Sequence, residues 1–354
     1  MKNKIGFYPE DRLRKENTYF LSISKCLKNI GWKTVDYREI YKDPEVLIVD
    51  LNFFENITAS NIFFAFLKFI KRIMIFSYIK LSRRKIIFTM HNKIAHDTKH
   101  PLMSSCLIKM QIKYADAIVA LCSETKNILR TYNRDTQILD KLYLIPHPIY
   151  ECNNKSIDLN KKSENNGHMK VLFVGQIRKY KNVEYILQLA RDHRSDNVDF
   201  LVAGKAENDD YKRELLENAK DITNLTFRFG YLSEDEMTEL IINSDLLIAP
   251  YNKVSTLNSG TLFLAFSLGT TCICPDIGSA LEVHDKNAFY MYTYETEKEH
   301  YDNLNKIFSK AVLDYQKGKL QEKGKLCLKE VNMYNSLEKV KNGYQELLQN
   351  IINK

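Results

Sequence analysis

The order in which short apolar runs and helical stretches follow one another constrains the fold of this chain most strongly. Each apolar run is separated from the next by a stretch of helical periodicity, and the pattern occurs twice. Such alternation is typical of a parallel β-sheet covered by helices. In the first half we expect strands at 4–9, 46–50, 85–90 and 117–121, a helix at 17–29, and a closing segment at 142–148. In the second half we expect strands at 170–174, 198–203, 225–229, 245–249 and 271–274, with helices at 182–192, 208–219, 233–243 and 259–267.

A polar segment separates the two alternating regions. Residues 151–168 are rich in Asn, Lys and Ser and contain almost no apolar side chains, which is typical of a linker. It divides the chain into Rossmann-like domains at 1–150 and 169–330, followed by a C-terminal helix at 331–354. We therefore predict an α/β protein in which two open sheets face each other across a cleft, where ligands bind such folds.

Charge and composition narrow the range of partners. The formal net charge is +8, which favours anionic partners such as phosphates or a membrane surface. The sequence carries no zinc spacing, helix-turn-helix or RNA-binding signature, so we expect no nucleic-acid partner. No Asp-x-Asp follows a strand, and we expect neither a metal nor a cofactor. The N-terminus is charged too early for a signal peptide, so we expect a cytoplasmic protein.

One candidate site begins where the strand at 170–174 ends. Gly175 follows that strand and opens a basic loop with Arg178, Lys179 and Lys181, after which a helix begins. A glycine followed by a helix start presents backbone N–H groups, and the added cations suit a diphosphate. The alternative is that these are solvated loop charges.

A second segment is expected to face this loop. After the strand at 245–249, the residues from Asn258 through Ser259 and Gly260 to Thr261 open another helix. Its N-terminal N–H groups suit an anion, although Ser and Thr also favour ordinary helix caps. We predict that the two segments form two walls of one nucleotide-diphosphate site. Tyr251, at the start of the second segment, either packs against the nucleotide or fills the core.

The stretch 57–85 combines basic and apolar residues without any acidic one. Its charge-free run, 57–67, is too short to span a bilayer, which takes about 20 residues. One interpretation is a buried helix with a basic solvent face. The other, which we favour, is a helix in the membrane interface with Lys and Arg among anionic headgroups. The basic residues are Lys68, Lys71, Arg72, Lys80, Arg83, Arg84 and Lys85.

In order and spacing, several landmarks resemble the nucleotide-sugar-binding domain of GT-B glycosyltransferases, closest to family 4. They are VGQIRKYKN from Val174, Ala203-Gly204, Phe229-Gly230-Tyr231, DLLIAPY from Asp245, Ser259-Gly260-Thr261, and Leu268-Gly269 through Pro275-Asp276-Ile277-Gly278. In the first half, Thr89-Met90-His91-Asn92 followed by His96-Asp97 resembles the acceptor-domain histidine loop.

The resemblance implies roles for individual residues. It places His91, Arg178 and Lys181 in catalysis. Gly175, Gly230, Tyr251, Asn258, Ser259, Gly260, Thr261 and Glu282 are expected at the donor, and Asn17, His96 and Asp97 on the acceptor side. There is one departure, because family 4 enzymes carry two glutamates where this chain has Thr256 and Leu264. The Asn-Ser-Gly-Thr start resembles instead a branch of bacterial polysaccharide transferases whose Ser-Gly turn holds the diphosphate.

The activity implied is metal-independent transfer of a hexose-type sugar from a UDP- or GDP-sugar. The implied acceptor is a lipid-linked glycan at the inner face of a bacterial membrane, as in the synthesis of O-antigen, capsule or exopolysaccharide, with the enzyme peripheral on that face. Two alternatives remain open: a nucleotide-sugar hydrolase or epimerase of the same fold, and a sugar-nucleotide-binding partner subunit that has lost catalysis.

Overall fold

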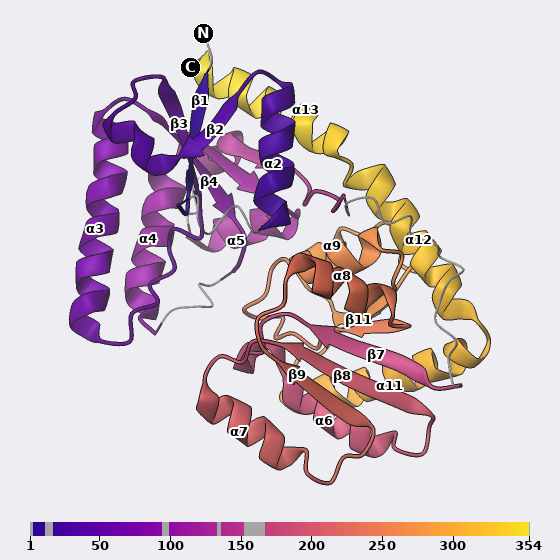
Figure 1. Cartoon of the computed structure of the whole chain (residues 1–354). Coiled ribbons are helices and arrows are strands. Elements are labelled where there is room, and N and C mark those ends of the chain that lie inside the picture. The colour runs from indigo at the N-terminus through magenta and orange to yellow at the C-terminus, as the bar shows by residue number, and fades with distance from the viewer. Residues whose placement is uncertain (1–2, 11–16, 94–98, 133–135, 152–166, 354) are drawn as a thin grey trace. The chain divides into compact units, whose positions relative to one another are not determined.

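The computed structural model describes residues 3–10, 17–93, 99–132, 136–151 and 167–353. The chain forms two compact units, each with one parallel six-stranded sheet (Figure 1). This confirms the predicted α/β class. The linker expected at 151–168 lies mostly outside the described residues, as 152–166 are not among them. The first unit comprises Met1–Pro148, Val254–Asn258 and Asn335–Lys354, and the second Ile149–Lys253 and Ser259–Tyr334.

The sheet of the first unit has the strand order β2-β1-β3-β4-β5-β6. Its side chains alternate between two cores, because neighbouring residues of a strand point to opposite faces. In β4, for example, Ile86 and Phe88 enter one core and Ile87 the other. The strands are β1 (Lys4–Tyr8), β2 (Lys33–Asp36), β3 (Val46–Asn52), β4 (Lys85–Met90), β5 (Ala117–Ala120) and β6 (Leu142–Leu144).

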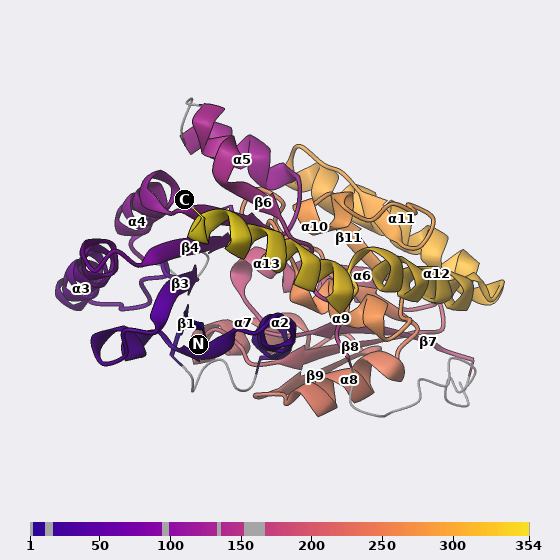
Figure 2. The same cartoon turned by 90° about the horizontal axis from the view of Figure 1, so that it is seen from above.

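Helices cover both faces of this sheet. On one face lie α2 (Thr18–Asn29) and α13 (Leu337–Ile352), which pack against each other (Figure 2). On the other lie α3 (Ile62–Leu81) and α4 (Pro101–Tyr114). The remaining elements of this unit are α5 (Glu124–Tyr132) and the 3₁₀ turns η1 (Tyr37–Tyr41) and η2 (Thr136–Lys141).

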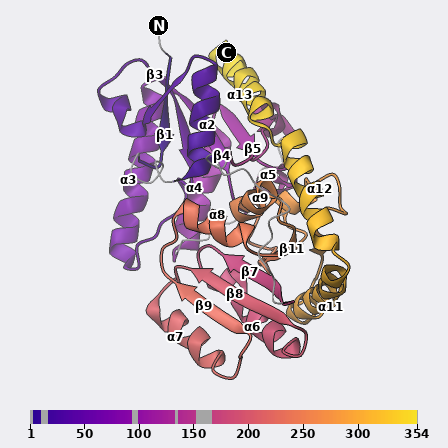
Figure 3. The same cartoon turned by 45° about the vertical axis from the view of Figure 1, so that its right-hand side comes forward.

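The second sheet has the order β12-β11-β10-β7-β8-β9, with α6 and α7 on one face and α8 and α9 on the other (Figure 3). The strands are β7 (Met169–Val174), β8 (Val198–Gly204), β9 (Leu225–Phe229), β10 (Leu246–Ile248), β11 (Cys272–Pro275) and β12 (Tyr290–Tyr292). The helices are η3 (Lys179–Lys181), α6 (Val183–Asp192), α7 (Asp209–Asn218), α8 (Glu234–Ile242), α9 (Gly260–Ser267), α10 (Gly278–Leu281), α11 (Glu297–Gln316) and α12 (Lys319–Tyr334).

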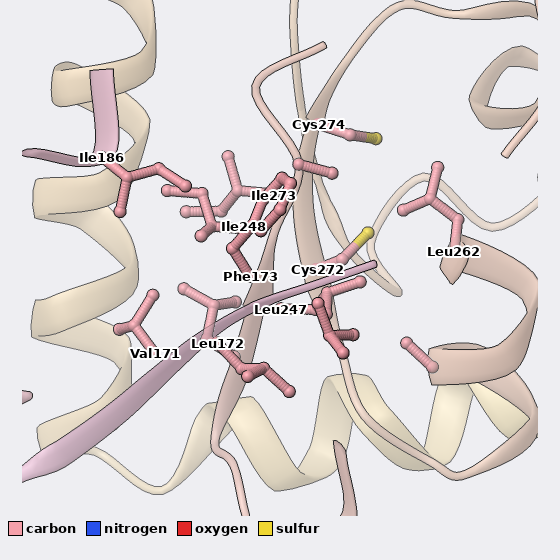
Figure 4. Packing of buried hydrophobic residues seen from close by; sticks show 14 of the residues in the cluster. Val171, Leu172, Phe173, Ile186, Leu247, Ile248, Leu262, Cys272, Ile273 and Cys274 are labelled. Carbon is pink, nitrogen blue, oxygen red and sulfur yellow. The ribbon is translucent and has the colours of Figure 1, made fainter. Parts of the chain in front are cut away.

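The core of the second unit lies between these layers. Aliphatic side chains of β7 and β10 pack there with Phe173, Ile186 from α6 and Leu262 from α9 (Figure 4). Cys272 and Cys274 are both completely buried free thiols. This dense packing fixes the carboxyl ends of β7 and β10, and hence the loops that follow them.

Two strands were not expected from the sequence, β2 and β12. Both are edge strands, at one end of their sheets. β2, with the sequence KTVD, is only partly buried and has no apolar run, while β12 has three residues. No helix among the described residues is both long enough and apolar enough to cross a membrane.

Candidate active site

The candidate donor site lies where the order of the second sheet reverses. β7 pairs with β8 on one side and with β10 on the other, so the chain leaves these central strands in opposite directions. In open α/β sheets, ligands bind outside the carboxyl ends of the strands at such a switch point. Gly175 follows β7 there, and Pro250 and Tyr251 come soon after β10.

Two glycines allow the backbone to turn sharply at the end of β7. Gly175 has φ +124° and Gly204, at the end of the neighbouring strand β8, has φ +143°. A Cβ atom on Gly204 would stand 1.7 Å from the carbonyl oxygen of Gly175. Only glycine at position 204 lets the two backbones approach this closely.

Hydrogen bonds join the loop after β7 to the segment after β10. Asn252 N–H donates to the carbonyl oxygen of Tyr180 at 2.9 Å, and the Asn182 side-chain amide donates to that of Pro250 at 2.9 Å. These bonds hold Lys181 beside Tyr251, with its Nζ 5.0 Å from the centre of the aromatic ring.

The cations of the basic loop take different positions. A Cβ atom on Gly175 would stand 3.5 Å from Lys181 Nζ and 3.7 Å from Thr261 Oγ1, so these two groups flank the glycine. Lys179 instead forms an exposed ion pair with Glu214 at 2.6 Å. The half-buried Arg178 donates from Nε to the side-chain oxygen of Gln176 at 2.8 Å. The structure thus brings Lys181, but not Lys179, to Gly175.

The N-terminus of α9 completes this group. Ser259 is the N-cap, and its hydroxyl accepts from Leu262 N–H at 3.4 Å. The N–H groups of Gly260 and Thr261 belong to the first turn, where a helix offers them no internal acceptor. Burial raises the pKa of Tyr251 to about 12, against the opposing effect of its hydrogen bonds to Ser259 and Thr261. Its hydroxyl is therefore neutral and fixes the helix start.

Gly230 and Glu282 follow two further strands of this sheet, Gly230 directly and Glu282 after a short helix. Gly230 follows β9 with φ +148°, and its N–H donates to the carbonyl oxygen of Gly204 at 3.1 Å. Glu282 is half-buried at the C-terminal end of α10, which follows β11, and its charge acts on Lys286.

In the first unit, a chain of buried hydrogen bonds leads to His91, which follows β4. Asn52 Nδ2 donates to Asp50 Oδ1 at 3.0 Å, which turns the amide oxygen of Asn52 toward His91. That oxygen lies 2.8 Å from His91 Nε2. Because an amide oxygen only accepts, Nε2 must carry the hydrogen. In the neutral ring, Nδ1 then holds the lone pair.

The surroundings of His91 keep its ring neutral. Burial, and secondarily the charge of His147, lowers the pKa of His91 to about 3. The ring stacks on Phe53 with 4.0 Å between the ring centres and meets Tyr19 edge-on at 5.1 Å. Such a ring suits hydrogen bonding better than proton abstraction, which favours a pKa near the working pH.

Asn258, expected at the donor, belongs to the first unit together with the short segment 254–258. Its side-chain amide donates to the carbonyl oxygen of His91 at 2.9 Å, and Leu257 beside it is completely buried in the core with α3 and α4. Asn17, expected on the acceptor side, is the exposed N-cap of α2 and accepts from Tyr19 N–H at 3.0 Å. His96 and Asp97 lie outside the described residues.

Comparisons with known proteins match this architecture. Residues 154–321 match the family model described as "Glycosyl transferases group 1". HepE of Anabaena, solved in complex with UDP and glucose, superposes with a TM-score of 0.72 at 11% identity, over 98% of this chain and 99% of that one. Sucrose-phosphate synthase from Thermosynechococcus elongatus gives 0.72 at 11% identity, over 99% and 100%. The chain has the GT-B glycosyltransferase fold.

Among curated sequences, this GT-B chain is similar to a GDP-mannose:glycolipid 4-beta-D-mannosyltransferase of Xanthomonas campestris pv. campestris. The two are 28% identical over 130 residues. The match covers 36% of this chain and 36% of the relative, so it spans about a third of either protein.

At the two positions where family 4 GT-B enzymes carry glutamates, the side chains are buried and uncharged. Thr256 is 3% exposed and belongs to the first unit, whereas Leu264 is 8% exposed within α9. Among the described residues, no group of three or more His, Cys, Asp or Glu side chains is placed to hold a metal ion.

Asp50 and Asn52 are not among the site residues predicted from the sequence. Their signal is present in the sequence, because both are polar residues inside the otherwise apolar strand β3. Buried polar groups require hydrogen-bond partners, so alternating polar residues near a strand end indicate a site.

Proposed function

We propose that the protein transfers a hexose-type sugar from a UDP- or GDP-sugar to a lipid-linked glycan, without a metal or cofactor. The process would be the synthesis of a bacterial surface polysaccharide such as O-antigen, capsule or exopolysaccharide, with the protein peripheral on the inner face of the membrane. The observation that carries the proposal is the placement of Lys181 and the N-terminus of α9 around Gly175.

The diphosphate is the leaving group of this reaction. The bond from its oxygen to the sugar C1 breaks and a bond from the acceptor hydroxyl oxygen to C1 forms, while the hydroxyl proton is lost to a base or solvent. Negative charge grows on the diphosphate as the first bond breaks. Lys181, Arg178 and the N–H groups of Gly260 and Thr261 stabilise that charge, the role that a divalent metal plays in other transferases.

We assign to His91 a hydrogen bond with the transferred sugar or with the acceptor hydroxyl. Its Nδ1 is the nitrogen that accepts, since Asn52 holds the hydrogen on Nε2. Asp50 and Asn52 are positioning residues that fix this tautomer. Of the other predicted residues, we assign Gly175, Gly230, Tyr251, Asn258, Ser259 and Glu282 to the donor side and Asn17, His96 and Asp97 to the acceptor side.

The relatives support both kinds of substrate. HepE is solved with UDP and glucose, which supports a nucleotide sugar as donor. The Xanthomonas relative is named for GDP-mannose and a glycolipid, which supports a lipid-linked acceptor and leaves the choice between uracil and guanine to experiment.

The test measures melting temperature and transfer separately. We expect either UDP or GDP to raise the melting temperature, since a ligand bound only by the folded protein stabilises it by about 2.7 kcal/mol at a hundred times its dissociation constant. The matching nucleotide sugar should be consumed only when a glycolipid acceptor is present, including in excess chelator. Consumption without acceptor would identify a hydrolase, and binding with no consumption would identify a non-catalytic binding subunit.

A further inference from the structure

The inner face of helix α3 holds it to the first unit. Ala65, Phe76 and Ile79 are buried there. Arg72 also faces inward, because its guanidinium donates to the carbonyl oxygen of Asn56 at 2.9 Å and lies 5.1 Å from the ring centres of Tyr8 and Phe54. Arg72 therefore helps to hold α3 against the rest of the first unit.

The outer face of α3 is apolar along its whole length. The exposed side chains recur three or four residues apart, a spacing that places them on one side of a helix. With 20 residues, the helix extends about 30 Å at 1.5 Å per residue. We call this face the α3 stripe, which consists of Phe63 (61% exposed), Phe66 (49%), Leu67 (48%), Ile70 (37%), Met74 (66%), Tyr78 (39%) and Leu81 (83%).

This arrangement reverses the ordinary pattern for a surface helix, which turns polar residues outward. Isolated exposed apolar side chains are common on protein surfaces, but a continuous row marks an interaction site. The alternative interpretation from the sequence, a buried helix with a basic solvent face, is wrong about the solvent face, which is apolar. Figure 1 shows α3 at the outer edge of its unit with α4 beside it.

Lysines flank the α3 stripe, which identifies the chemistry of its partner. Lys68 and Lys71 are exposed on one side of it, and Lys80 on the other side forms an ion pair with Asp116 at 3.1 Å. The stretch 57–85 contains no acidic residue. Aromatic and aliphatic side chains bordered by lysines suit the boundary between acyl chains and anionic headgroups.

We propose that α3 lies flat in an anionic lipid leaflet, with the α3 stripe among the upper acyl chains and Lys68 and Lys71 at the phosphates. This deepens the proposed function by assigning its membrane partner to one helix face. The main attraction comes from burial of the stripe, with the lysines adding selectivity for anionic lipid. High salt should therefore weaken vesicle binding without abolishing it, since salt screens charges and leaves apolar burial intact.

The test compares two triple variants of the full chain by vesicle flotation. The first, Leu67→Gln, Met74→Gln and Leu81→Gln, removes three exposed stripe residues while keeping a good helix former at each position. The control, Leu144→Gln, Leu216→Gln and Leu313→Gln, changes three exposed leucines on other elements. On phosphatidylglycerol–phosphatidylethanolamine vesicles we expect the stripe variant to bind about a hundred-fold more weakly than wild type, and the control to bind normally.

A second variant tests the lysines. Lys68→Gln with Lys71→Gln should weaken binding to these vesicles by about five-fold per lysine, and should leave binding to phosphatidylcholine vesicles unchanged. Arg72 stays intact in every variant, because its loss would leave a partly buried carbonyl group without its donor.

Three outcomes overturn the proposal. They are wild-type protein that ignores anionic vesicles at low salt, a stripe variant that binds as wild type does, and a wild-type dimer that the stripe variant alone converts to monomer. The last result would assign the stripe to a second copy of the chain. The nucleotide-induced melting shift, measured on the same samples, reports the donor site independently, so lipid binding and the proposed transfer can fail separately.

Discussion

The two units use the same type of sheet to build opposite kinds of site. Both have six parallel strands, yet their orders differ: in strand sequence the first is 2-1-3-4-5-6 and the second 3-2-1-4-5-6. The first places buried polar side chains, Asp50, Asn52 and Thr89, at strand ends around a neutral His91. The second places glycines and a lysine at its strand ends. The site of the first unit depends on fixed hydrogen bonds between side chains. The site of the second unit depends on backbone groups that glycines leave uncovered, and on charge.

The largest expected effect tests the open backbone of the second site. Gly204→Ala should lower the free energy of unfolding by at least about 3 kcal/mol, because it adds a backbone clash to an unfavourable φ. Gly230→Ala is the matched control: its φ is +148° against +143°, but nothing lies within 4 Å of its Cβ position. It should cost only about 1–2 kcal/mol in urea unfolding. Equal losses would show that the contact with Gly175 is relieved by small movements.

The next prediction separates the two lysines of the basic loop. Lys181→Ala should weaken nucleoside diphosphate binding by roughly ten- to hundred-fold, the effect of one charge-assisted hydrogen bond. Lys179→Ala should change it little, because Lys179 pairs with Glu214. Calorimetry with the nucleoside as a second ligand shows whether the loss belongs to the phosphates. An equal loss for the nucleoside would instead assign Lys181 to the base or ribose.

Acid should destabilise the first unit through its buried histidines. Burial lowers the pKa of His91 to about 3 and that of His147 to about 4, against an ordinary value of 6.5. Below pH 6.5 the unfolded chain takes up protons that the folded chain does not, so stability falls as pH falls. The loss should be about 2 kcal/mol per histidine between pH 7 and pH 5.

His91→Gln should remove its part of that pH dependence in urea unfolding measured at the two pH values. His300 of the second unit, whose pKa burial lowers to about 4, contributes in the same direction. If His91→Gln leaves the pH dependence unchanged, the pKa of His91 is the same in the folded protein as in the unfolded chain.

The smallest effect tests the positioning of His91. Asn52→Ala should lower the transfer rate by roughly five- to ten-fold, because the ring loses the hydrogen bond that fixes its tautomer. Nucleotide affinity should not change. Thr89→Val is the control, since it removes a hydrogen bond to the same Asp50 carboxylate without touching His91. Thr89→Val should lower the free energy of unfolding but change the transfer rate little. A similar loss of transfer rate in both variants would show that Asn52 has only a structural role.

Much of the fold could be predicted because buried parallel strands are recognisable as apolar runs. β4 at Lys85–Met90 and β9 at Leu225–Phe229 have the predicted bounds. The strands β2 and β12 could not be predicted, because the sequence KTVD of β2 contains no apolar run and β12 has only three residues. The sequence also could not predict which side of α3 faces the solvent. Apolar residues occur on every side of this helix, so the contacts of Arg72 show which side faces inward.

The residues of the candidate site, like the strands, could be predicted only in part. Gly175 and Lys181 could be predicted because a strand, a glycine and a basic loop follow each other along the chain. The chain from Asp50 through Asn52 to His91 depends on which strands are neighbours, since Asn52 pairs with Thr89 across β3 and β4. The approach of Gly204 to Gly175 likewise depends on neighbouring strands. Sequence order alone does not carry this information.

Helix α13 has a consequence for protein synthesis and for recombination. Val340, Tyr344 and Leu347 of α13 are buried against α2 and the first sheet. Along the chain, however, the second unit lies between α13 and these elements. A ribosome must therefore translate the whole second unit before the first unit can bury this face. A hybrid gene that exchanges the first unit for that of another transferase must exchange three separate segments, because one crossover point would leave α13 facing a foreign partner.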